Sequence, residues 1–211
     1  MDIMTLLERV AGYAHERYAE EMRAVKEEYF RDLTIMHESD ELYEEAMKAY
    51  LDIFLFEHPV DAEGRTVIDG FLADEGPALS EEEQTALRAL AGAERALYQI
   101  RKTDELGVDL QNLMTGKKFH VLEDNISAFF KGDILEARVL PVLDIYRFGD
   151  HLRFHPKRAG RVIRKAAKAI GADNERAARA LMRALALRKV KHYRFPRIDL
   201  LEFYKDVADT V

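Results

Sequence analysis

Apolar residues recur at helical spacing along the first part of the chain. In residues 2–34 they form a stripe of alternating threes and fours, with no proline and no glycine after Gly12. The stripe continues from Tyr18 one position out of phase. This pattern predicts one helix of about 45 Å, at a rise of about 1.5 Å per residue. A helix of that length needs an apolar partner, within the chain or in a second copy.

Two further helices are indicated by their ends. One runs toward His58 and stops there, because the residue before Pro59 disfavours helical backbone. The other follows Ser80, whose spacing to Glu83 is that of a capping box. Acidic residues in a first turn also suit the positive end of the helix dipole, so we interpret residues 81–83 as a helix start rather than as a metal site.

From about residue 96 the hydrophobic period changes to two, which is typical of half-buried strands. Turn residues at 115–118 and 131–133 separate the segments, and Gly149-Asp150 suggests a last hairpin. The expected strands are residues 96–100, 108–113, 119–121 and 134–140, followed by the two arms of the last hairpin, 145–148 and 152–154. Five short strands at this spacing predict a small antiparallel β-barrel, either SH3-like or OB-like.

Helical periodicity returns after Pro156 and continues to the end of the chain. The fold class that follows is α+β, mainly helical, with the β-barrel module between two helical regions. We therefore expect an acidic helical region over residues 1–92, the β module over 93–155 and a basic helical region over 156–211.

Charge is distributed unevenly along this chain of 211 residues, whose net charge is −7. Residues 1–92 hold 23 Asp and Glu against 8 Lys and Arg, a net charge of −15. Residues 151–194 hold 14 Lys and Arg against 2 Asp and Glu, a net charge of +12. Such asymmetry suggests that the basic segment meets a polyanion or the acidic half of a protein.

The chain has no cysteine, which excludes disulfides, thiolate metal sites and thiol catalysis. Its first residues carry charges at positions 8, 9, 15, 16 and 17, so they lack the apolar run of a signal peptide or membrane span. We expect a cytoplasmic protein that does not associate with membranes.

The basic segment is the strongest functional signal. Its cations fall on the faces of two successive helices, opposite the apolar stripes. Clustered arginine and lysine attract phosphate backbones and release counterions on binding. The candidate nucleic-acid contacts are Arg158, Arg161, Arg164, Lys165, Lys168, Arg176, Arg179 and Arg183.

Two other interpretations of the basic segment stay open. Gly171 followed by Asn174 could begin the second helix of a helix-turn-helix, although most pairs of consecutive helices are joined in this way. Alternatively, the acidic half of this chain or of another protein neutralises the segment, and its role is then protein–protein contact.

Enzymatic and metal motifs do not occur in the sequence. There is no phosphate-binding glycine loop, no nucleophile elbow and no zinc-peptidase motif. His151 and His155 would share one face of a strand, but a metal site needs a third ligand, and none is specified nearby. We therefore expect no metal and no cofactor.

The β segment resembles a module of uncharacterised bacterial proteins that often end in a SEC-C zinc-binding motif. The matching stretches are DLQNLMTG at 109–116, GDILEARV at 132–139 and PV at 141–142, within a resemblance that covers about residues 45–155. The zinc-binding tail has no counterpart, since cysteine is absent. The resemblance implies a fold and carries over no activity and no site residue.

The sequence thus favours a non-enzymatic binding or scaffold protein that acts through protein–protein contacts, with self-association along the first helix. Nucleic-acid binding through the basic helices is the alternative. An enzyme without a recognisable motif is the third hypothesis.

Overall fold

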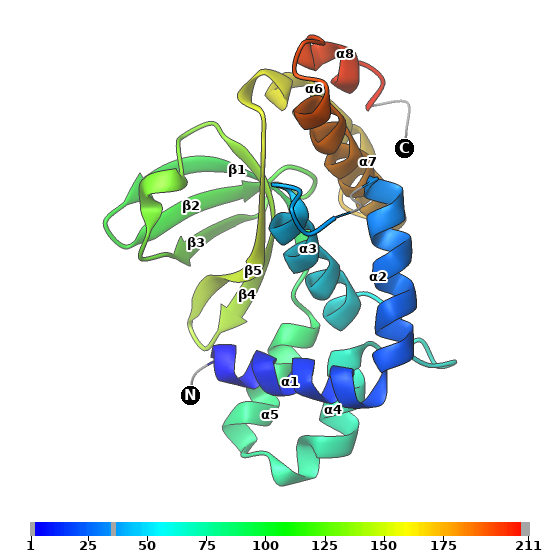
Figure 1. The fold of residues 1–211 in the computed structure, drawn as a ribbon. Coiled ribbons are helices and arrows are strands. Elements are labelled where there is room, and N and C mark those ends of the chain that lie inside the picture. Colours follow the sequence, from blue (N-terminus) through cyan, green and yellow to red (C-terminus); the bar gives the residue numbers. More distant parts are fainter. Residues whose placement is uncertain (1–2, 35–36, 208–211) are drawn as a thin grey trace. The chain divides into compact units, whose positions relative to one another are not determined.

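The computed structural model describes residues 3–34 and 37–207, which form two compact units (Figure 1). The N-terminal unit runs to Ala93 and includes two short pieces of a β-hairpin, Leu140–Asp144 and Gly149–His151. The C-terminal unit contains the rest of the hairpin, the other strands and the last helices. The protein is therefore mixed α and β, broadly α+β as expected.

The N-terminal unit is built from five α-helices and a 3₁₀ turn within the described residues. Its elements are α1 (Ile3–Arg17), α2 (Ala19–Leu33), α3 (Tyr43–Phe56), α4 (Val67–Glu75), η1 (Gly76–Ala78) and α5 (Glu81–Ala91). The predicted capping box is confirmed at α5, where the Ser80 hydroxyl accepts from the Glu83 amide and the Glu83 carboxylate accepts from the Ser80 amide.

The prediction of one long helix over residues 2–34 is wrong. The chain changes direction at Tyr18, where the backbone leaves the helical region with φ −126° and ψ 28° (Figure 1). The bend lies where the apolar stripe shifts phase, so α1 and α2 can each turn an apolar face inward. Val10 and Ala14 of α1 and Leu33 of α2 are buried in this way. The long uncovered stripe that suggested self-association therefore does not exist.

The C-terminal unit contains three whole strands, most of two others and three α-helices among the described residues. The strands are β1 (Arg95–Asp104), β2 (Gly107–Asn112), β3 (Lys118–Leu122), β4 (Ile134–Val142) and β5 (Ile145–His155). The helical elements are η2 (Ile126–Ala128), η3 (Lys157–Ala159), α6 (Gly160–Ile170), α7 (Glu175–Arg194) and α8 (Leu200–Tyr204). The strands close into a ring in the order β1-β2-β3-β5-β4.

Two details of the predicted β module are wrong. The ring is not purely antiparallel, because β3 pairs with β5 in parallel, with Val121 opposite Tyr146. The last hairpin does not turn at Gly149-Asp150, which lie inside β5; the chain turns instead at Leu143, whose φ is 53°. Leu143 is apolar yet three-quarters exposed, so the hydrophobic pattern of the sequence does not mark this turn.

Side chains on the inner face of the ring form one apolar cluster, which includes Tyr98, Ile100, Leu110, Val121 and Leu135. On the outer face of β1 and β4, Leu97 and Ile134 belong to a second cluster with α6, α7 and α8. Alternation along the strands therefore builds two cores, one on each side of the sheet.

A buried ionic group ties three strands together on that same outer face. Glu136 of β4 is fully buried and accepts from Arg95 of β1 and from Arg153 of β5, the latter at 3.0 Å. Both arginine side chains are more than nine-tenths buried. A buried carboxylate holds its charge only where cations and donors compensate for lost water, which both guanidinium groups do here.

Within residues 3–34 and 37–207, no helix has both the length and the apolar character that crossing a membrane requires.

Glu136→Gln should lower the free energy of unfolding by about 3 kcal/mol or more, because it leaves two buried guanidinium groups without their shared carboxylate. Urea unfolding followed by circular dichroism measures the change. Glu105→Gln, at an exposed turn position, is the matched control and should shift stability by less than about 0.5 kcal/mol. Equal effects of the two substitutions would contradict a structural role for the buried carboxylate.

Candidate nucleic-acid interface

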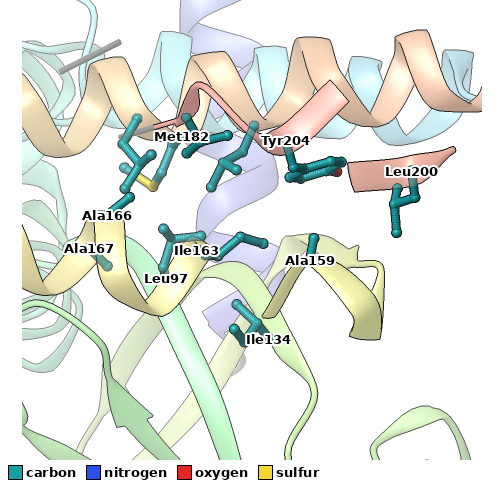
Figure 2. Packing of buried hydrophobic residues seen from close by; sticks show 12 residues of the cluster. Leu97, Ile134, Ala159, Ile163, Ala166, Ala167, Met182, Leu200 and Tyr204 are labelled. Atoms are coloured by element: carbon teal, nitrogen blue, oxygen red, sulfur yellow. The ribbon is translucent and has the colours of Figure 1, made fainter. Parts of the chain in front are cut away.

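The candidate interface is built on α6, which follows Pro156 and the short turn η3. Its apolar face is made by Ile163, Ala166 and Ala167, all buried. In Figure 2 these side chains point from α6 toward Leu97 of β1 and Met182 of α7. Small residues at two of the three positions let α6 lie close against its neighbours.

This packing fixes which face of α6 meets solvent. The exposed residues of the opposite face have spacings of three, one and three, so they lie along one side of the helix. They are Arg161, Arg164, Lys165 and Lys168. Because the apolar side is held against the sheet and α7, these four cations cannot rotate inward without exposing the buried cluster.

The structure places all eight sequence-predicted residues at exposed positions. Four lie together on α6, as just described. Arg158 precedes them in η3, and Arg176, Arg179 and Arg183 follow on α7. The helices are joined through Gly171, whose φ of 73° ends α6, and Asn174, whose side chain caps α7 by accepting from Ala177.

Carboxylates restrain some of these cations and not others. Arg158 donates to Asp199 at 2.8 Å, and Arg179 lies 3.5 Å from Glu175. Arg179 and Arg183 also have interaction partners of their own. Among the described residues of the C-terminal unit, no carboxylate pairs with the four cations of α6. We refer to Arg161, Arg164, Lys165 and Lys168 as the α6 cationic face.

The Arg158–Asp199 pair is electrostatically distinct from that face. The Arg158 guanidinium and the Leu201 amide both donate to Asp199 and hold the pKa of that carboxyl below its usual range. Asp199 also caps α8, since it precedes the first residue of that helix. Arg158 therefore links η3 to α8, which makes it part of the scaffold for the α6 cationic face.

Sequence reasoning did not find a second surface, on the outer side of β1, β2 and β3. A cavity of about 360 Å³ lies there, lined by Arg101, Asp109, Leu110, Lys118, Phe119 and His120. We refer to it as the outer-strand cavity. Asp109 and His120 are cross-strand partners, and the His120 ring nitrogen Nδ1 lies 2.8 Å from Asp109 Oδ1. The period-two pattern puts these polar residues on one face and could have shown the grouping.

A larger cavity, of about 500 Å³, belongs to the N-terminal unit between α2 and α3. Lys26 enters it and lies over the rings of Phe30 and Tyr43, at 5.6 Å and 5.7 Å from their centroids. Its ammonium group also donates to the Tyr43 hydroxyl at 3.2 Å. Lys26, one of the cations that line this cavity, is thus engaged by the protein's own aromatic residues.

The paired histidines of β5 are buried. The side chains of His151 and His155 are less than one-twentieth exposed. They lie on the same face of β5 as Arg153, which stands midway between them along the strand. In the part of the chain that the structure describes, no three His, Asp or Glu side chains are grouped as metal ligands.

Comparison with known proteins gives a family match. The model of a family of unknown function (DUF7986) matches residues 8–191. No curated protein and no solved structure is similar enough to count as a match.

Arg158→Gln should raise the pKa of Asp199, because the charged donor that stabilises the carboxylate is removed while the Leu201 amide remains. Carbon-detected NMR titration of the side-chain carboxyl groups measures the midpoint in both proteins. In the native protein, the midpoint for the Asp199 carboxyl should lie at a pH below the usual range for aspartate. An unchanged midpoint in the variant would mean that Arg158 is not held by Asp199 in solution.

Proposed function

The chain belongs to DUF7986, a family whose function is unknown, so its activity must be inferred from its own residues, and we propose that it binds nucleic acid through the α6 cationic face. The observation that carries this proposal is the set of four exposed cations on one side of α6 without a carboxylate partner in their unit. Arg176, exposed at the start of α7, extends the same basic surface along the chain.

Phosphate is the chemistry that best fits this surface. Two of the four residues are arginines, whose planar guanidinium groups can donate two hydrogen bonds to one phosphate. An exposed row of cations releases counterions when it meets a polyphosphate, which supplies a large part of binding at low salt. The face is held rigidly by the apolar side of α6, so little conformational entropy is lost when it binds.

The negative charge of residues 1–92 does not oppose this proposal at physiological salt. The Debye length is about 8 Å there, so repulsion between exposed charges further apart is largely screened. Within the C-terminal unit, the exposed charges of the α6 face itself are all positive.

We also propose a class for the β-barrel. The parallel β3–β5 pair and the ring order β1-β2-β3-β5-β4 favour an OB-like over an SH3-like barrel.

The likeness to SEC-C-associated bacterial proteins gains support from its two glycine turns, since Gly116 and Gly132 both have positive φ values, of 74° and 91°. A cytoplasmic location fits a nucleic-acid ligand and the absence of cysteine.

Arg164→Glu/Lys168→Glu should weaken nucleic-acid binding by on the order of tenfold or more at about 50 mM salt, because each reversal removes a phosphate contact and adds repulsion. Fluorescence anisotropy with labelled oligonucleotides measures the affinity. For the native protein, four phosphate contacts predict a fall of roughly 50- to 150-fold between about 50 and about 200 mM salt.

The matched control is Arg88→Glu/Lys205→Glu, which changes the net charge equally at exposed positions outside the α6 face. It should retain nearly all of the affinity. Absence of binding by the native protein at low salt, or an equal loss in both double variants, would refute a nucleic-acid site on α6.

Protein binding is a second candidate function, favoured by one specific observation. Three large apolar side chains after α7 are exposed to solvent: Phe195, Ile198 and Leu201, at 55%, 46% and 40%. A surface of this kind, close along the chain to Arg194 and Arg197, suits an apolar and acidic partner segment or a second copy of the chain.

Self-association through these residues predicts a dimer at tens of micromolar that Phe195→Ser/Ile198→Ser converts to monomer, because the apolar area buried between copies is lost. Sedimentation velocity measures the molar mass of both proteins. Leu106→Ser, at another exposed apolar position, is the control and should leave the mass unchanged. A native protein that sediments as a monomer would remove self-association from consideration.

A further inference from the structure

A chain of contacts within the C-terminal unit runs from η3, the turn directly before α6, to the outer-strand cavity. Lys157, three residues before Gly160 of α6, lies 3.2 Å from Asp133 and places its ammonium group 4.9 Å from the centroid of the Phe130 ring. The neighbouring carbonyl of Gly132 accepts from the Gln99 side chain of β1 at 3.5 Å. Arg101, which lines the cavity, donates to the other end of Gln99 at 3.3 Å.

This path is mainly basic where it is exposed. Lys131, Lys157, Arg101 and Lys118 all lie at exposed positions on or beside it. The carboxylates along it are already engaged, since Asp133 is paired with Lys157 and Asp109 with His120. A strand of phosphates that continues beyond α6 would therefore meet these cations, beside carboxylates that already have partners of their own.

Phe130 stands midway on the path and is 56% exposed. Its ring is available to a ligand on one face, because Lys157 lies over the other. Exposed aromatic rings between basic residues are the stacking platforms on which proteins hold unpaired bases, whereas the bases of a duplex are stacked on each other and cannot reach such a ring.

The outer-strand cavity is suited to the next nucleotide along the strand. Its volume of about 360 Å³ falls within the range of small-ligand pockets, about 300 to about 1,000 Å³. Arg101 and Lys118 supply cations for a phosphate, and the His120 ring, oriented by Asp109, supplies a second nitrogen for a base edge.

We propose that the nucleic acid is single-stranded and runs from the α6 cationic face past Phe130 into the outer-strand cavity. This inference rests on the proposed function and names the class of its ligand. Small barrels with a basic groove cover about 4 to 16 nucleotides, so a 12-nucleotide strand is a suitable probe of this site.

The test is anisotropy of the full chain at about 50 mM salt with a labelled 12-nucleotide single strand and with the duplex of the same length. The single strand should bind at least about tenfold more tightly than the duplex. Phe130→Ala should weaken single-strand binding by about 5- to 150-fold, the range for loss of one stacked base, and should leave duplex binding unchanged. Arg101→Glu/Lys118→Glu should weaken single-strand binding as well.

Leu143→Ala, which truncates another largely exposed apolar side chain outside the path, is the matched control and should bind as the native protein does. Equal affinity for both ligands, or a Phe130→Ala variant that binds the single strand like the native protein, would overturn the inference while the α6 site stands. Failure of the native protein to bind either ligand would overturn the proposed function and the inference together.

Discussion

The C-terminal unit depends on the two ion pairs that the carboxylate of Glu136 makes with arginine side chains. It is fully buried, and it holds β1 through Arg95 and β5 through Arg153. The cross-strand register places Leu97 of β1 directly opposite Glu136, and Leu97 is part of the surface on which α6 packs. A slip of one residue would turn Leu97 into the ring and bury a charge there. The orientation of α6, and with it the direction of its cations, thus follows from this ionic group.

The same arrangement explains how a chain with a net charge of −7 can present an exposed basic surface. The buried side of α6 is apolar and narrow, so every charged residue of the helix lies on the solvent side. Two cations beside it, Lys157 and Arg158, are used to fix the turn before α6 and the helix after α7. The remaining four are left for a ligand. Structural and binding roles are thus divided between residues that the sequence shows as one uniform basic run.

Much of this could be predicted from the sequence, because it depends on local rules. The capping box at Ser80, the solvent-facing cations of α6 and the glycine turns before β4 follow from spacing alone. The break at Tyr18 was visible as a phase shift, but its meaning depends on which helices cover each half. The parallel β3–β5 pair and the burial of Glu136 and Arg153 are set by contacts between distant segments, which periodicity does not encode. The outer-strand cavity likewise needs three strands in register.

The most direct test of the account is to map the ligand onto the protein by amide NMR of the deuterated full chain. A 12-nucleotide single strand is titrated in at low salt while backbone chemical shifts are followed. The account predicts that shifts cluster at residues 157–168, at Phe130 and at the strand residues 99–101 and 117–120. Shifts confined to residues 193–201 or to the N-terminal unit would contradict it, as would a spectrum that does not change.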